Sequence, residues 1–433
     1  MAAQPAAVPL RAVVDLFLCL KPLWADLIER SSKMKKNTIG VVLAGAMLLS
    51  GTAIAGPQMT FGPEDKGVLQ LDYKGQFQLV VRDTGSGADK SNTTTDFNFR
   101  RNRLALMGAY GDMLSMYVQT EFLEKQNITP LSVVDGDANT DFSILDAQIR
   151  FDFNKALKVH VGKFKYNMSR ENLESCEDPL TLDRSLFIRA PFTTTRDKGV
   201  AVWGNLFNDM FQYRLDVMNG RSAAGTETPK SNFRYSGRVH ASLLDPETSY
   251  GYKGTYLGKK KVLTVGAAYQ WEPDVAFGDT AKSGAVDYKG WTTDIFFEYP
   301  LENIGTVTFS GAYEDIDLGG AYKGTSPDAG TIGLNGEKNG WYVKAAYMLP
   351  NLPLQFFGRY EKWKFAALNL NNSGTATDTI YDQRIDWYGV GANYYFRDQN
   401  LKLTMEFSQT QFDKKNASTN DFTTFITQLQ LVF

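Results

Sequence analysis

The chain has 433 residues, a formal net charge of −2 and two cysteines, and its mean hydropathy of −0.30 would suit a water-soluble protein. The slightly negative charge argues against a nucleic-acid-binding protein, which usually carries a basic surplus. The cysteines, Cys19 and Cys176, form no CxxC or CxxCH motif, which excludes a covalently attached c-type haem. The sequence predicts no cofactor and no metal site.

Residues 34–55 have the pattern of a secretory signal peptide. Lys35 and Lys36 form a basic region, residues 39–49 form a mostly apolar run, and Ala53-Ile54-Ala55 is a small-residue cleavage site. We therefore expect a mature domain at residues 56–433. Residues 1–33 stand where a signal peptide should already have begun. We expect an over-extended reading frame with initiation at Met34, and a long targeting extension is the alternative.

Beyond residue 55, apolar and polar residues alternate with the period of a β-strand. In the segment Val68 to Arg82, Leu69, Leu71 and Tyr73 share one face, while Gln70 and Asp72 share the other. We count sixteen such segments, which begin near Val68, Phe99, Leu114, Phe142, Leu157, Gly199, Met210, Arg234, Val262, Trp291, Gly305, Gly340, Leu354, Ile385, Leu401 and Thr424. Lipid-facing and lumen-facing residues of a membrane barrel cancel in a hydropathy average, which accounts for the soluble-like value.

The last segment, FTTFITQLQLVF, alternates up to the terminal Phe433. A strand at the end of the chain needs a partner on both edges, and closure onto the first strand provides one. The ending resembles the final strand of bacterial outer-membrane barrels. We therefore predict an all-β fold, a 16-stranded antiparallel transmembrane β-barrel in the outer membrane of a Gram-negative bacterium, surrounded by outer-membrane lipid. A soluble β-sandwich is the less fitting alternative.

Short and long connections alternate along the predicted strands. Turns such as Gly111-Asp112 and Asn208-Asp209 are short, whereas stretches such as Asn219–Phe233 are long and polar. Short periplasmic turns and long external loops are typical of outer-membrane barrels. Asp245 to Lys261 is long where a short turn is due, so either the strand count is wrong there or that turn is elaborated.

The longest loop carries the most specific motifs. Gly162-Lys163-Phe164-Lys165 leads into a Ser- and Glu-rich turn at 169–175 and then into Asp183-Arg184-Ser185-Leu186. Together with the run 99–104 and with 218–220, these residues resemble the phosphate-selective porin O/P family. The resemblance implies a sixteen-stranded, usually trimeric barrel, whose third external loop folds into the lumen, and an arginine ladder that draws anions to a narrow zone.

Two readings of this loop stay open. It carries Leu173, Leu180, Leu182 and Phe187, which are too apolar for a floating loop and need a wall to pack on, so we expect it to fold inward. The alternative is surface decoration. Between Phe164 and Lys198 the acids and bases are equal, at six each, so the loop itself lacks the cationic surplus that phosphate selectivity would favour.

Candidate pore-lining and solute-binding residues follow from strand parity and from the resemblance. Arginine can bind phosphate or carboxylate oxygens in bidentate fashion. The candidates are Arg101, Arg103, Arg214, Arg238, Arg359, Lys163, Lys165 and Arg184. The competing interpretation is that wall carboxylates neutralise these cations and that the pairs hold the barrel in shape.

These patterns favour a porin for small hydrophilic solutes, with an anion or phosphate preference as the finer expectation and a homotrimer as the expected assembly. An enzyme would need an activated nucleophile or a His-assisted water, and neither His160 nor His240 has a Ser-containing motif beside it. The alternative function is a scaffold barrel around an electron-transfer or other partner protein. Such a sleeve would need an unobstructed lumen.

Overall fold

The computed structural model describes residues 56–87, 91–123, 127–128, 133–134, 141–185, 195–221, 228–279, 281–318, 320–321, 337–369, 379–415 and 419–433. The two expected leader segments, 1–33 and 34–55, lie outside these residues, as does part of the longest loop, 186–194. Within the described ranges no helix is long and apolar enough to cross a bilayer.

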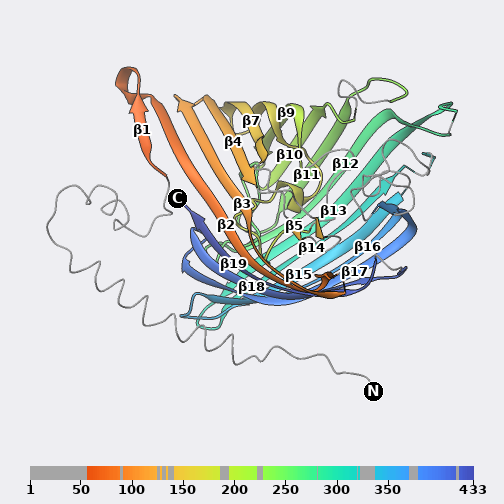
Figure 1. The fold of residues 1–433 in the computed structure, drawn as a ribbon. Coiled ribbons are helices and arrows are strands. Elements are labelled where there is room, and N and C mark those ends of the chain that lie inside the picture. The colour runs from red at the N-terminus through yellow and green to blue at the C-terminus, as the bar shows by residue number, and fades with distance from the viewer. Residues whose placement is uncertain are drawn as a thin grey trace. The chain divides into compact units, whose positions relative to one another are not determined.

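Sixteen antiparallel strands form one closed sheet, in which the last strand pairs with the first (Figure 1). Because the sheet is closed, the backbone N–H and C=O groups of the wall strands are paired and no strand edge is left free. The predicted 16-stranded antiparallel barrel is thus confirmed. Its strands are β2 (Gly67–Ser86), β3 (Asn92–Tyr110), β4 (Leu114–Leu123), β7 (Asp141–Asn154), β8 (Leu157–Lys165), β9 (Arg196–Leu206), β10 (Phe211–Met218), β11 (Arg234–Ser242), β12 (Val262–Phe277), β13 (Ala285–Leu301), β14 (Gly305–Asp317), β15 (Glu337–Met348), β16 (Leu354–Asn369), β17 (Thr379–Arg397), β18 (Leu401–Phe412) and β19 (Phe422–Val432).

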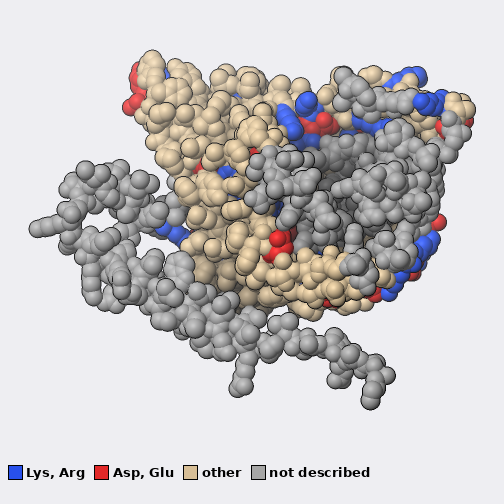
Figure 2. Space-filling view, in the orientation of Figure 1, with Lys and Arg blue, Asp and Glu red and all other residues tan. Residues whose placement is uncertain are grey.

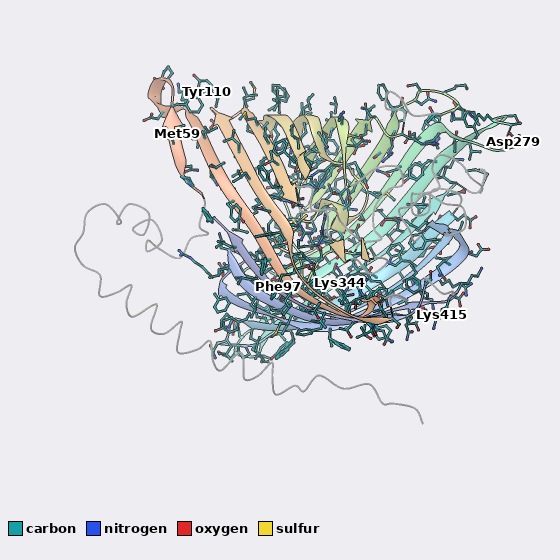
Figure 3. The ribbon with its side chains drawn as sticks, viewed as in Figure 1. Met59, Phe97, Tyr110, Asp279, Lys344 and Lys415 are labelled. Atoms are coloured by element: carbon teal, nitrogen blue, oxygen red, sulfur yellow. The ribbon has the colours of Figure 1, made fainter. Side chains whose placement is uncertain are left out.

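A further strand that the sequence did not predict, β1 (Gln58–Phe61), completes the closing seam. β19 pairs with β2 only from Lys74 to Arg82, and Phe433 then exchanges two backbone hydrogen bonds with Tyr73. β1 pairs with residues 67–70 of β2, after the one-turn helix η1 (Pro63–Asp65) reverses the chain. It therefore covers the part of the β2 edge that β19 does not reach. Met59 lies at the same end of the barrel as Tyr110 (Figure 3).

Some strands extend further toward the long loops than the alternation predicts. β3 begins at Asn92 instead of near Phe99, and β17 begins at Thr379 instead of near Ile385. β2 and β3 stay paired as far as Ser86 and Asn92. The ladder of backbone hydrogen bonds does not depend on apolar alternation, so it continues into polar sequence.

The two faces of the wall differ as the period-two pattern predicts. On β10, Leu215 is 58% exposed and Val217 40%, whereas Arg214 and Asp216 are only 1% and 3% exposed. The outer face of a closed barrel is uncovered in a single chain, so the buried, polar face is the inner one. In Figure 2 most of the described wall that faces the viewer is uncharged, and many of the visible charges lie near the rims.

The connection between β11 and β12, residues 243–261, is long although it lies at the end where the other connections are short. We call it the strap. Leu243 and Asp245 donate backbone hydrogen bonds to Leu263 and Lys261, so the strap leaves and re-enters the wall as a hairpin. The predicted strand count is therefore right, and this turn is elaborated.

Among the described residues, the helices η1 and α3 and the short strands β5 and β6 lie outside the sheet of the wall. The long loop (residues 166–195) joins β8 to β9 and contains the one-turn helix α3 (Arg170–Leu173), whose first turn is capped by the Ser169 hydroxyl. β5 (Asn127–Ile128) and β6 (Val133–Val134) pair with each other in the connection between β4 and β7.

Candidate solute-binding site

The long loop makes hydrogen bonds and ion pairs with side chains of several wall strands. Glu171 pairs with Lys344 of β15, and the Ser185 hydroxyl donates to Glu361 of β16. Further contacts reach β13, β17, β18 and β19, through Asp294 (3.2 Å from the Arg170 amide), Asn393 (3.0 Å from the Leu180 carbonyl), Glu406 (3.2 Å from the Leu182 amide) and Gln430 (2.9 Å from the Glu177 carbonyl).

The long loop also binds the strap. The Ser175 amide donates to the Tyr252 carbonyl at 2.9 Å, and the Gly254 amide donates to the Asp178 carbonyl at 2.9 Å. Nη1 and Nη2 of Arg170 lie 2.6 and 2.7 Å from the carboxylate oxygens of Glu247, with both side chains buried. Segments far apart in the sequence thus meet through main-chain bonds and one bidentate ion pair.

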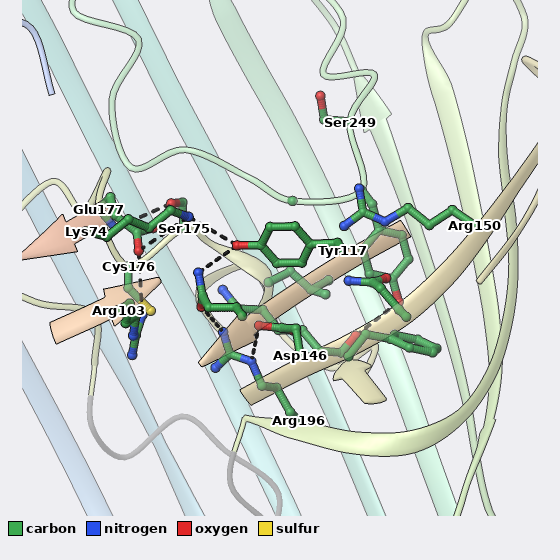
Figure 4. Close-up of a pocket in the computed structure, with 17 residues that line it drawn as sticks. Lys74, Arg103, Tyr117, Asp146, Arg150, Ser175, Cys176, Glu177, Arg196 and Ser249 are labelled. Atoms are coloured by element: carbon green, nitrogen blue, oxygen red, sulfur yellow. Dashed lines mark hydrogen bonds and ion pairs between the residues drawn. The ribbon is translucent and has the colours of Figure 1, made fainter. Parts of the chain in front are cut away.

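A cavity of about 300 Å³ lies beside this junction (Figure 4). Its walls come from β2, β3, β4, β7, β8 and β9 together with Leu173 and residues 175–177 of the long loop and 249–251 of the strap. We call it the basic pocket, because five cations but only two carboxylates line it. The cations are Lys74, Arg103, Arg150, Lys165 and Arg196, and the carboxylates are Asp146 and Glu177.

Three of the five cations face a carboxylate. Arg196 lies 2.9 Å from Asp146, and Glu177 lies 3.8 Å from Lys74 and 3.6 Å from Arg103. Burial alone would raise the pKa of Glu177, but Lys74 and Arg103 lower it well below its usual range. The carboxylate therefore stays ionised and cancels part of the positive charge.

The other two cations, Arg150 and Lys165, form no ion pair with any residue that the structure describes. Arg150 lies over the ring of Tyr117, with its guanidinium carbon 5.2 Å from the ring centre. Lys165 donates to the main-chain carbonyl of Glu174. Neither a ring nor a carbonyl cancels a unit charge, so the pocket keeps a positive surplus.

Most of the predicted wall arginines are paired. Arg101 binds Asp183 at 2.8 Å, Arg103 binds Glu121 at 2.7 Å, and Arg238 binds Asp294 at 2.6 and 2.8 Å, while Arg359 pairs with Glu361. For these four residues the geometry agrees with the interpretation that wall carboxylates neutralise the arginines.

Arg214 differs from the other four. It lies directly opposite Arg238 on the neighbouring antiparallel strand, as the parity predicts, and it is 1% exposed. It donates to Gln212 at 2.6 Å and to the Ser249 carbonyl at 3.3 Å, and it forms no ion pair within the described part of the chain.

The three loop-region candidates take different places. Lys165 lines the basic pocket. Arg184 donates to the carbonyls of Glu171 and Asn172 at 3.0 and 3.1 Å, at the end of α3, so it fastens the long loop. Lys163 does not join the group, because its ammonium donates to the Ile144 carbonyl in an exposed hydrogen bond at 2.6 Å. It has the parity of the outer face, which the GxFK resemblance did not reveal.

Sequence reasoning missed Arg100, whose parity places it on the outer face. The register between β2 and β3 shifts at Gln76/Phe77, so Arg100 is an extra residue in a bulge. The bulge brings Arg100 and Arg101 to the same carboxylate, and Arg100 lies 2.7 Å from Asp183. Burial alone would raise the pKa of Asp183, but these two arginines lower it well below its usual range. No sequence signal marks such a bulge.

The fold is that of bacterial outer-membrane porins, as solved structures indicate. An anion-selective porin from Comamonas acidovorans matches with a TM-score of 0.55 at 10% identity, over 85% of this chain and 100% of that one. OmpF of Salmonella typhi in complex with daunomycin gives 0.55 at 12%, over 87% and 100%. The outer membrane channel DcaP of Acinetobacter baumannii gives 0.50 at 13%, over 86% and 99%.

The family is shown by a match over most of the chain. The model of the family described as phosphate-selective porin O and P matches residues 71–433, so the chain belongs to that family. No curated protein matches. The protein is therefore a Gram-negative outer-membrane porin, a channel for small solutes, as the sequence predicted.

Proposed function

We propose that this porin favours anions and that the basic pocket is where they bind during passage. The observation that carries the proposal is that two of the five cations lining a cavity of about 300 Å³, Arg150 and Lys165, form no ion pair with a described residue. In a passage bounded by low-dielectric walls, water screens a fixed charge incompletely, so a small surplus raises the local concentration of anions.

We also propose that the long loop lies inside the barrel and constricts it. Its contacts with inner-face side chains on β13, β15, β16, β17, β18 and β19 support this proposal. A loop in that position leaves solutes a path beside it, through the basic pocket. The same contacts count against the scaffold alternative, because a sleeve for a partner protein needs an unobstructed lumen.

Two further expectations stay proposals. We propose that three copies assemble, on the strength of the family resemblance. We also propose that the mature chain begins at Gly56 after cleavage of residues 34–55, with 1–33 not made, and an intact-mass measurement of outer-membrane material tests this. The family and the fold favour a channel over catalysis, and the absence of an enzymatic activity likewise stays an expectation.

The test is the reversal potential of single channels in a salt gradient, for the wild type and for Arg150→Gln combined with Lys165→Gln. These substitutions remove the two cations of the pocket that form no ion pair with a described residue. We expect the wild type to prefer anions and the double variant to lose much of that preference. Lys155→Gln is the matched control, because the Lys155 side chain is 79% exposed at a short turn. An unselective wild type would overturn the proposal and leave a general porin.

A further inference from the structure

We propose that the strap is the second half of the constriction and that it determines selectivity, because it stabilises the Arg214 guanidinium with neutral groups and leaves its charge uncancelled. This inference rests on the proposed anion-preferring function. It assigns a role to residues 243–261, which connect two strands at the short-turn end of the barrel.

Several side chains of the strap are buried. Glu247, Tyr252 and Thr255 are only 2%, 1% and 1% exposed, so the strap is not a surface turn. The amides of Tyr256 and Gly258 and the hydroxyl of Thr255 all donate to the Glu298 carboxylate of β13, at 2.8 to 3.0 Å.

The strap also binds two other wall strands, β9 and β10. Asn205 donates to the Thr248 carbonyl at 3.0 Å, and Gln212 donates to the Glu247 carbonyl at 3.4 Å. Glu298 and Gln212 are 0% and 1% exposed inner-face residues. The strap therefore enters the barrel from the short-turn end.

The strap and the long loop form one unit. Tyr252 and Glu174 make a β-bridge, flanked by the hydrogen bond from Ser175 to Tyr252. Arg170 is held by Glu247 and also donates to the Lys253 carbonyl at 2.9 Å. Neither segment keeps these main-chain bonds if the other moves, so we treat the two as a joint obstruction.

The strap surrounds the Arg214 guanidinium with uncharged groups. The guanidinium carbon of Arg214 lies 4.8 Å from the ring centre of Tyr250 and 4.6 Å from that of Tyr252. The Ser249 carbonyl accepts one of its hydrogen bonds, and its Nη1 has no hydrogen-bond partner among the described residues. Aromatic faces and carbonyls stabilise a buried cation without neutralising it. The strap also supplies Ser249 and Tyr250 to the lining of the basic pocket.

Arg238 differs from Arg214 in its partners. Arg238 contacts the Tyr252 hydroxyl at 3.2 Å but is neutralised by Asp294 in a bidentate pair. The two arginines lie directly opposite each other and both contact the strap, but only Arg214 lacks a carboxylate partner among the described residues. A buried guanidinium without a carboxylate partner acts on a passing carboxylate or phosphate through its field, which low-dielectric surroundings screen incompletely.

Two variants separate the two roles. Tyr250→Leu with Tyr252→Leu removes the rings from Arg214, and we expect the reversal potential to shift toward zero. Replacing residues 247–258 by a four-residue turn should raise single-channel conductance. Lys259→Ala is the control on the same segment, since the Lys259 side chain is 63% exposed, and it should change neither quantity. Heat-modifiable migration on gels confirms that each barrel is folded.

A thiol probe tests the position of the strap without disturbing the fold. In a Cys176→Ser background, Ser249→Cys should react with a sulfonate-bearing methanethiosulfonate and lose current, whereas Lys259→Cys should not. If the shortened strap keeps wild-type conductance, or if Ser249→Cys reacts without any change of current, the inference is overturned. If the wild type is unselective, both the anion preference and the selectivity role of the strap are refuted. If conductance nevertheless rises when the strap is shortened, the strap still acts as an obstruction.

Discussion

Replacing Glu247 by alanine is the most direct perturbation of the junction between the long loop and the strap. Arg170 would then lie buried against Phe296, its guanidinium carbon 3.9 Å from the ring centre, without its carboxylate partner. Removing one member of a buried, hydrogen-bonded ion pair costs about 3–5 kcal/mol. The wall strands do not share this pair, so we expect the cost to fall on the junction and the barrel to stay closed.

A cost of this size changes the ratio of intact to open junctions by a factor of roughly a hundred or more, since each 1.4 kcal/mol is about tenfold. We therefore expect Glu247→Ala to show larger and noisier single-channel currents than the wild type. Lowering the pH within the near-neutral range should not reproduce the larger and noisier currents of the variant. Burial alone would raise the pKa of Glu247, but Arg170 lowers it to about 2. The pair's contribution is thus fully present above the unfolded-state pKa and is lost only as pH falls toward 2.

Planar-bilayer recordings of three proteins test this reasoning. Asp398→Ala is the matched control, because it breaks an ion pair with Lys259 at 2.5 Å in which the side chains are 48% and 63% exposed. Exposed pairs contribute only about 0–1 kcal/mol, so its currents should be those of the wild type. Arg170→Met with Glu247→Leu removes both charges and should largely restore quiet currents. A folded Glu247→Ala barrel with wild-type currents would refute the role of the junction.

Three further predictions concern other parts of the molecule. Phe433→Ser should lower the amount of barrel in the outer membrane but leave the conductance of inserted channels unchanged, because Phe433 is 42% exposed and packs on Tyr73; normal abundance would contradict this. Deleting residues 170–185 should raise conductance with the barrel still folded, whereas a surface loop would leave it unchanged. Burial and Glu171 raise the pKa of Glu174, so the folded protein holds a proton that the unfolded chain releases, and the junction should loosen as pH rises from about 5 to 9. Glu174→Gln should abolish that dependence in bilayer recordings.

Period-two alternation was sufficient to predict the wall. It gives the strand count, the closing pair of β19 with β2, and the facing positions of Arg214 and Arg238. Parity fails where the backbone breaks the period, as at the bulge that turns Arg100 toward Asp183. It is also silent about β1, whose place is decided by how far β19 reaches along β2.

The strap shows a different limit of sequence reasoning. The length of the segment Asp245 to Lys261 marks the strap as unusual. Its position, however, depends on hydrogen bonds with Glu298, Gln212 and Asn205, which come from three separate strands. Each contact is ordinary hydrogen bonding of a buried polar group. Their convergence is a property of the closed ring, so no local pattern in 243–261 predicts it.

Under the proposed function, the pairing of charges explains how a nearly neutral lumen can discriminate between ions. A paired arginine and carboxylate, such as Arg238 with Asp294, act at a distance as a dipole, whose field falls off faster than that of a single charge. Arg150, Lys165 and Arg214 form no such pair with a described residue, and each is held by rings or carbonyls instead. Counting charges along the strands therefore misjudges selectivity, because the paired majority contributes little. Under the proposed function, a few cations held by neutral partners dominate the field that a solute meets.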